Sequence, residues 1–160
     1  MQTIVRVTLL TCLVCGGVGH VATARAQGAP VATASANPGV DFLQAFADAW
    51  NRHDVDALMS FMTPDGVFEA SAGDAVDGQR YEGQQAVRAA YAAIFAAYPD
   101  ARWGNARHFV AGDRGLSEWT FTGTMKDGKR VETTGCDVFT FRNGKIAIKN
   151  SYRKNRPPIG

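Results

Sequence analysis

The chain has 160 residues, of which 46% are hydrophobic and 20% charged, and this length suits a single domain. It carries 17 Lys and Arg residues against 15 Asp and Glu. Two of the basic residues, Arg6 and Arg25, belong to the N-terminal segment described next, so the rest is neutral overall. A neutral domain has no charge excess to attract nucleic acid or an anionic membrane, and we expect neither as a partner.

The first 26 residues have the pattern of a secretory signal. Arg6 supplies the positive start, Val7 to Gly19 is an uncharged apolar run, and Ala24-Arg25-Ala26 is a small-x-small cleavage pattern. The apolar run is shorter than the ~20 residues that span a bilayer. We therefore predict a signal peptide at 1–26, cleavage between Ala26 and Gln27, and a periplasmic or secreted protein. An N-terminal membrane anchor and a misassigned start codon are the alternatives.

Cysteine and histidine usage argues against redox and metal chemistry. Cys12 and Cys15 form a C-x-x-C pair, but both lie in the apolar run of the signal. Cys136 alone remains, so no internal disulfide can form and the core must hold the fold. His53 and His108 show no metal-ligand spacing, and no glycine-rich phosphate loop is present. We expect no metal and no cofactor.

Periodicity predicts helices first and strands afterwards. Residues 27–39 are rich in small residues and read as a flexible lead-in. Apolar residues at helical spacing predict helices at 40–52, at 55–62 with Asp54 as its cap, and at 84–97 before Pro99. Between them we expect a short strand at 67–71 and a loop at 73–83. Alternation then predicts strands at 102–110, 116–125, 130–141 and 145–153.

The order of elements predicts an α+β domain at 40–154, followed by a basic tail at 155–160. The order is α-α-β-α-β-β-β-β, which places three helices on one face of a curved antiparallel sheet. Asp127-Gly128 and Asn143-Gly144 are hairpin turns, because each glycine can adopt positive φ.

With this order, the chain resembles the nuclear-transport-factor-2-like superfamily, and within it the SnoaL-like polyketide cyclases and ketosteroid isomerases. The resemblance covers about 40–153 and is carried by three stretches: FLQAFADAWNRHDVDALMSF from Phe42, WTFTGT from Trp119 and CDVFTFRNGKI from Cys136. It implies a conical fold with a pocket on its concave face, usually in a homodimer. The fold hosts several chemistries and some non-catalytic proteins.

The resemblance implies specific catalytic positions, of which few are kept. The ketosteroid isomerase proton-transfer aspartate matches Ala70, its helical tyrosine matches Phe46, and its second oxyanion donor matches Asp137. The acid-base aspartate of the SnoaL-like cyclases falls late in the last strand, where Lys149, Arg153 and Lys154 stand. We therefore do not expect a steroid isomerase or the known cyclase chemistry.

Hairpin register suggests a cluster of charged residues. A two-residue turn at Asp127-Gly128 would pair Lys126 with Lys129, and Glu118 would then face Asp137. Two facing carboxylates repel each other, so a shared proton or a nearby cation must compensate.

The last strand offers that cation. A three-residue turn at Arg142-Asn143-Gly144 would pair Asp137 with Lys149, whereas a two-residue turn would turn Lys149 away; Asn-Gly suits both. With the resemblance favouring the former, we adopt Asp137, Glu118 and Lys149 as candidate catalytic residues. On the same face, Arg153, Thr120 and Ser151 would bind substrate, and Lys149 or Arg153 could hold a carboxylate or an enolate. The alternative without a function is a row of opposite charges that faces solvent and contributes little to stability.

If these polar residues point inward, an apolar set points outward: Trp119, Phe121, Val138, Ile146, Ile148 and Tyr152. So apolar a face predicts a homodimer through the outer side of the sheet. The rival arrangement buries these side chains and exposes the charges, as burial statistics favour.

Four further residues are candidate substrate contacts. Phe46 and Trp50 could line the pocket mouth, although aromatics at helical spacing are usually core. Glu69 and Tyr81 flank the loop where the pocket opens in this fold. His108, near a strand end, is a possible acid-base group.

Three functions fit these observations. The first is a cofactor-independent lyase, isomerase or cyclase that acts by proton transfer on a small organic molecule. The second is a non-catalytic periplasmic protein that binds a small ligand. The cations would favour an anionic ligand. The third is a dimerising scaffold without chemistry. The residues do not identify a substrate, a reaction or the oligomeric state.

Overall fold

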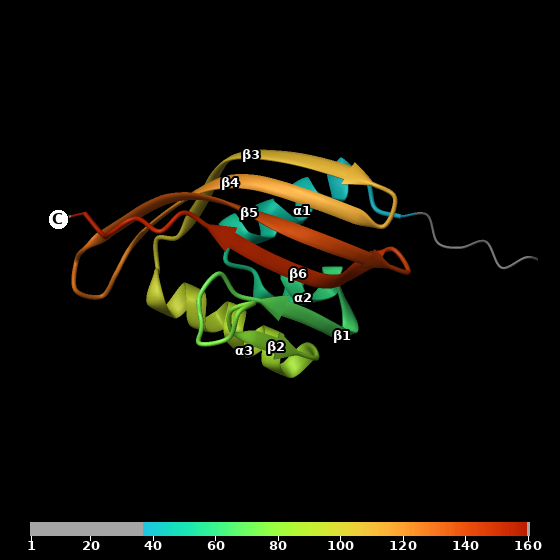
Figure 1. Cartoon of the computed structure of the whole chain (residues 1–160), viewed down its shortest axis with the longest axis horizontal. Helices are drawn as coiled ribbons and strands as arrows, with labels where there is room; N and C mark the ends of the chain where they lie inside the picture. Colours follow the sequence, from blue (N-terminus) through green and yellow to red (C-terminus); the bar gives the residue numbers. More distant parts are fainter. Residues whose placement is uncertain (1–36, 160) are drawn as a thin grey trace, which may run out of the picture. The chain divides into compact units, whose positions relative to one another are not determined.

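The computed structural model describes residues 37–159, so the predicted signal peptide and most of the lead-in lie outside the described residues. These residues form three α-helices and six β-strands (Figure 1). In chain order they are α1 (Val40–Asn51), α2 (Val55–Phe61), β1 (Met62–Glu69), β2 (Arg80–Glu82), α3 (Gln84–Ala97), β3 (Arg102–Ala111), β4 (Arg114–Thr124), β5 (Arg130–Arg142) and β6 (Lys145–Arg153).

The strands form one sheet in the order β2-β1-β6-β5-β4-β3, and the helices lie on one face of it, behind the sheet in Figure 1. This arrangement confirms the α+β class. The sheet is antiparallel as predicted except at one pairing, where β1 runs parallel to β6. A helix separates β1 from the meander that follows, so no tight turn forces it to oppose its neighbour. The predicted loop at 73–83 also contains the short edge strand β2.

Local sequence explains the helix boundaries. The buried stripe of α1 consists of Leu43, Phe46, Ala49 and Trp50. The chain then turns at His53, whose φ is 55°, and the side chain of Asp54 accepts a hydrogen bond of 2.9 Å from the backbone N–H of Ala57. That bond is the predicted cap of α2.

The β4–β5 hairpin has a different register from the predicted one. Its loop has three residues, Lys126 to Gly128: the Met125 N–H bonds to the Lys129 carbonyl at 2.9 Å, and Gly128 adopts a φ of 84°. Thr124 therefore pairs with Arg130, and every pair is shifted by one residue. Because strand side chains alternate, a one-residue shift moves a side chain to the other face.

The β5–β6 hairpin combines a tight turn with a bulge. Asn143 and Gly144 both have positive φ, 53° and 74°, and form the two-residue turn that was the disfavoured alternative. A bulge near Ala147 then shifts the register, so that Asp137 pairs with Ser151. Lys149 lies two residues before Ser151 and so shares the face of Asp137.

Tryptophan 119 is accommodated on the helix-covered face by a glycine. Trp119 pairs with Gly135 across β4 and β5. A β-carbon on Gly135 would lie 2.4 Å from Cη2 of Trp119 and 2.3 Å from the carbonyl oxygen of Tyr152. Glycine here allows the indole to lie flat across β5.

Within residues 37–159, no helix combines the length and apolar character needed to cross a bilayer.

We expect Gly135→Ala to destabilise the domain by roughly 3 kcal/mol, because the added carbon meets a backbone oxygen as well as the indole ring. Gly104→Ala is the matched control: an added β-carbon in β3 meets nothing within 4 Å, and its effect should stay within about 0.5 kcal/mol. Urea unfolding curves of the wild type and both variants give the free energies of unfolding to be compared. Equal stabilities would contradict the proposed packing.

Candidate functional site

The helix-covered face of the sheet holds a buried polar cluster made by Asp137, Lys149 and Ser151. The Lys149 ammonium lies 2.7 Å from Oδ1 of Asp137 and donates to Oγ of Ser151 at 2.7 Å. Ser151 donates to the same carboxylate oxygen at 2.6 Å. The side chains of Lys149 and Asp137 are only 6% and 9% exposed, so this ion pair is buried.

The second carboxylate oxygen of Asp137 is also occupied. Nε1 of Trp119 donates to Oδ2 of Asp137 at 3.1 Å. Both oxygens therefore accept hydrogen bonds from neighbouring side chains. Asp137 holds Lys149 and Trp119 in place.

The ammonium of Lys149 lies among aromatic rings. Its nitrogen is 4.9 Å from the ring centre of Phe68 and 5.4 Å from that of Trp50. The electron-rich faces of these rings stabilise a cation. An ammonium has three N–H donors, and within the described residues protein oxygens take two of those of Lys149.

A pocket of about 240 Å³ opens beside this ammonium. Its polar lining residues are Lys149, Ser151, Arg153 and Ser71, and its described lining includes two cations but no carboxylate. The walls are aromatic or aliphatic and consist of Trp50, Phe68, Ala70, Ala72, Ile94, Tyr98, Trp103, Trp119 and Phe121. Such a lining suits a flat, partly apolar molecule with a negative oxygen.

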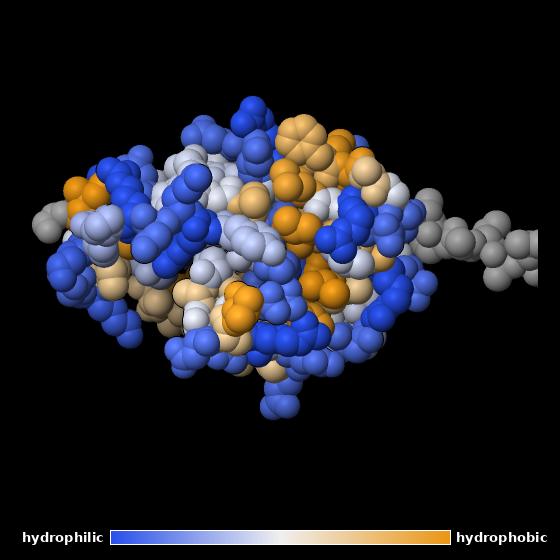
Figure 2. All heavy atoms as spheres, viewed as in Figure 1, coloured by the Kyte–Doolittle hydropathy of each residue, from blue (hydrophilic) through white to orange (hydrophobic). Residues whose placement is uncertain are grey.

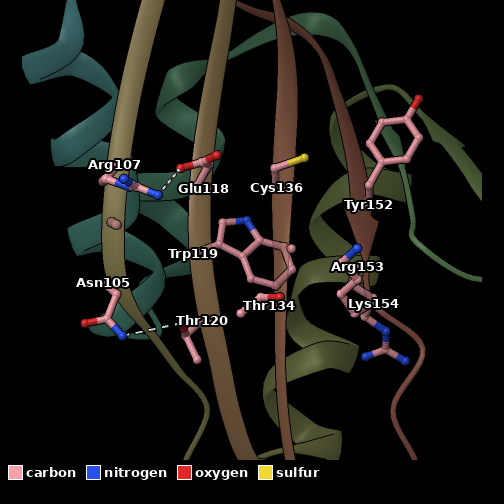
Figure 3. A pocket seen from close by; sticks show the side chains of 12 residues that line it. Asn105, Arg107, Glu118, Trp119, Thr120, Thr134, Cys136, Tyr152, Arg153 and Lys154 are labelled. Atoms are coloured by element: carbon pink, nitrogen blue, oxygen red, sulfur yellow. Dashed lines mark hydrogen bonds and ion pairs between the residues drawn. The ribbon is translucent and has the colours of Figure 1, made fainter.

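A second, larger hollow of about 830 Å³ lies on the opposite face of the sheet (Figure 3). There Arg107 points to Glu118 at 2.8 Å, and Asn105 points to Thr120 at 3.4 Å. The Arg107 and Glu118 side chains are 75% and 44% exposed, so water screens their attraction. A shallow surface with screened charges is a weaker ligand site than the buried cluster.

The structure separates the predicted catalytic residues. Asp137 and Lys149 meet, but Glu118 lies on the outer face opposite Cys136, and the prediction that it faces Asp137 was wrong. Thr120 was also predicted to line the pocket and instead lies on the outer face. The cause for both is the three-residue loop that shifts β4 by one position.

Among the predicted substrate contacts, Ser151, Arg153 and Trp50 line the pocket, and three others besides Thr120 do not. Phe46 is a core residue, 2% exposed, packed edge-on against Trp50 and Phe139. Glu69 pairs with Arg80 at 2.5 Å on the β1–β2 edge.

Tyr81, the third, stacks on Phe68 with ring centres 5.8 Å apart. It is likewise absent from the pocket lining.

The two predicted arrangements of the sheet faces were each right in part. Trp119, Phe121 and Ile146 were predicted to point outward but pack into the helix-covered interior. Val138, Ile148 and Tyr152 do alternate onto the outer face. Because the register differs from the predicted one on β4, apolar Trp119 and charged Asp137 share the interior.

The sequence did not predict that polar residues of β3 and β4, His108 and Ser117, share the inner face with Asp137. His108 pairs with Ser117, and Ser117 pairs with Asp137, directly across three strands. Nδ1 of His108 lies 2.7 Å from Oγ of Ser117. Reading the Asp127-Gly128 turn as a three-residue loop would have placed Ser117 beside Asp137.

Within the described residues, no three His, Cys, Asp or Glu side chains are grouped so as to hold a metal. Burial and the nearby charge of Asp137 raise the pKa of Cys136, so its thiol stays protonated. Neither observation adds a reactive group to the pocket.

Residues 43–148 match the family model described as a SnoaL-like domain. A structure from Xanthomonas campestris, named as a candidate polyketide cyclase, has a TM-score of 0.65 at 21% identity, over 72% of this chain and 89% of that one. A nuclear-transport-factor-2-like protein of unknown function from Mesorhizobium loti is 30% identical, with a TM-score of 0.61 over 72% and 90%.

A Catenulispora acidiphila protein with a ketosteroid isomerase-like fold, solved with trimethylamine, has a TM-score of 0.62 at 20% identity over 72% and 85%. The sequence matches no curated protein. These likenesses confirm the fold expected from the resemblance.

Removing either partner of the buried ion pair should destabilise the domain, and the two losses of stability should not add. We expect Asp137→Leu and Lys149→Met each to cost about 3–5 kcal/mol, because the remaining charge is buried without its partner. The double variant should lose less than the sum of the two, by roughly 2 kcal/mol or more. Urea unfolding of all four proteins measures this coupling, and strictly additive losses would show that the two charges do not depend on each other.

Proposed function

We propose that this chain, which belongs to the SnoaL-like domain family, binds a small planar organic anion in the pocket beside Lys149. The observation that carries the proposal is the buried ammonium, which faces an aromatic pocket with an uncommitted N–H donor. A negative oxygen of the ligand would accept that hydrogen bond in a medium of low dielectric, where charged bonds are strong.

The pocket lining supports the proposed shape and charge of the ligand. The volume of about 240 Å³ suits a molecule of one or two rings. Arg153 lies at the pocket together with Lys149, and a carboxylate has two oxygens to share between such cations. The aromatic walls would stack on a flat ligand.

A cofactor-independent isomerase, lyase or cyclase is the catalytic form of the same proposal. A buried ammonium can stabilise the enolate oxygen that forms when a water molecule takes a proton from the carbon next to a carbonyl group. In this form Lys149 holds the oxyanion and Asp137 is a positioning residue. Glu118 has no role, since it lies on the other face. The likeness to a candidate polyketide cyclase supports this second candidate.

Binding without catalysis is favoured by the bonding of Asp137. Both of its oxygens already accept hydrogen bonds from protein side chains, so neither faces a ligand without a competing donor. The described pocket lining contains no other carboxylate and no histidine to carry a proton. A scaffold without any ligand is disfavoured, since such a protein has no need for a buried lysine beside a pocket.

Benzoate is a suitable probe for binding. We expect it to bind the wild-type protein, and Lys149→Met to weaken binding roughly tenfold to a hundredfold, because a charged hydrogen bond is lost. Lys126→Met, which removes an exposed lysine outside the pocket, is the control and should bind as wild type does. Calorimetric titration gives both affinities; equal binding by all three proteins would rule out Lys149 as the anion contact.

Enolate chemistry has a separate readout in the same variants. A catalyst would speed exchange of the α-protons of acetylacetone in D₂O, followed by NMR, and Lys149→Met would abolish the acceleration. A wild-type protein that binds benzoate without accelerating exchange is a binder.

We also propose a homodimer through the outer face of the sheet. Phe109 and Tyr152 are 55% and 54% exposed there. Leu116 and Val138 continue the row from Phe109 across β4 and β5. Apolar atoms gather over this face in Figure 2. An apolar band of this kind usually marks an interface, and a second copy presents a matching one.

Phe109→Glu should turn the dimer into a monomer, because a carboxylate would be buried at the interface. Val76→Glu alters another exposed apolar residue, in the loop after β1, and should leave the dimer intact. Sedimentation velocity of the three proteins decides between the outcomes, and a monomeric wild type would exclude the dimer.

Export remains a proposal that rests on the sequence of residues 1–26. Expression in a bacterial host should yield periplasmic protein whose first residue is Gln27, as read by N-terminal sequencing. Ala26→Arg should block cleavage, because the peptidase site needs a small residue. Uncleaved cytoplasmic wild-type protein would contradict the assignment.

A further inference from the structure

A much smaller cavity lies between α1 and the strands β3, β4 and β5. Its volume is about 20 Å³. Trp50, Trp103 and Trp119 line both this cavity and the larger pocket, so the two are neighbours. The polar residues of the small cavity are His108, Ser117 and Asp137.

Two nitrogen atoms in this lining have no protein partner. Within residues 37–159, the buried side-chain nitrogens and oxygens without a hydrogen bond are Nε1 of Trp50 and Nε2 of His108. Both residues line the small cavity. A buried polar atom without a partner costs about 1–3 kcal/mol. Two residues that line one cavity and each carry such an atom therefore favour a shared polar ligand there.

The chemistry of the two nitrogens specifies that ligand. The indole N–H of Trp50 can only donate. Burial lowers the pKa of His108, so its ring is neutral near pH 7, with one nitrogen a donor and the other an acceptor. Its Nδ1 lies against Oγ of Ser117, a hydroxyl that can donate or accept, so Nε2 takes either role.

A hydroxyl oxygen satisfies both nitrogens in either tautomer. It has lone pairs to accept from Trp50, and it can donate to His108 or accept from it as required. A carbonyl oxygen fits one tautomer only. The volume agrees, because a cavity needs about 10–15 Å³ to hold one water-sized group.

We propose that this cavity is a binding site for a single hydroxyl oxygen, held between Nε1 of Trp50 and Nε2 of His108. The oxygen belongs either to a water molecule or to a hydroxyl group at the far end of the ligand in the larger pocket. The second source rests on the proposed function. In that case the ligand is a planar hydroxy acid that spans from Lys149 past the Trp50 ring to His108.

A crystal structure of the wild-type protein without ligand tests the water source. The site requires an oxygen peak within about 3.2 Å of both nitrogens. This measurement is independent of the anion pocket and of any variant that fails to fold.

Paired ligands test the second source. 4-Hydroxybenzoate and benzoate differ only by the hydroxyl group, and the site predicts that the hydroxy acid binds roughly tenfold more tightly to the wild type. His108→Phe should abolish this preference while keeping affinity for benzoate. His53→Phe is the matched control and should keep the preference, since Nε2 of His53 is already 2.9 Å from the Ala101 carbonyl oxygen outside the cavity.

The outcomes separate the two proposals. Failure of benzoate to bind overturns the anion pocket and leaves the water site to crystallography. A bound oxygen between the nitrogens, from water or from the hydroxy acid, supports the site. No oxygen in the unliganded crystal together with equal binding of the two acids by wild type overturns it.

Discussion

The buried ion pair between Lys149 and Asp137 is the interaction on which the rest of the site depends. Removing two charges from water costs several kcal/mol for each ion, and their attraction repays this only with further hydrogen bonds. Ser151 and Trp119 supply them, one on each carboxylate oxygen. The pair therefore depends on polar side chains from three neighbouring strands, β4, β5 and β6. These bonds explain how a lysine side chain that is only 6% exposed remains beside aromatic rings.

The two faces of the sheet have separate physical characters, and this separation suggests separate roles. The helix-covered face carries the ion pair, the aromatic pocket beside Lys149 and the small cavity beside His108. The outer face carries the exposed Arg107–Glu118 pair and the apolar row from Phe109 to Val138. A ligand on the inner face and a second copy on the outer face would therefore not compete. The family fold permits both uses and prescribes no chemistry, so the function has to be argued from Lys149 and its surroundings.

The helices and most strand boundaries could be predicted because they depend on short-range signals. The stripe of Leu43, Phe46 and Trp50 predicts α1, Asp54 caps α2, and glycine residues mark both hairpins. The register could not be predicted, because Asp-Gly and Asn-Gly each suit turns of more than one length. Asp127-Gly128 takes the longer form and Asn143-Gly144 the shorter, the reverse of the predicted assignment. The bulge at Ala147 shifts the register of β6 by one residue, so Lys149 lies on the same face as Asp137.

The sequence by itself determined the α+β class, the order of the helices and the meander, and the presence of an acid and a lysine on adjacent strands. Tertiary structure alone decided which side chains meet, because the face of a strand residue changes with one position of register. For that reason Glu118 lies outside the site, whereas Ser117 and Trp119 lie on the helix-covered face. Gly135 illustrates the same dependence: its role exists only because the Trp119 ring lies across it, and that contact joins residues from two different strands.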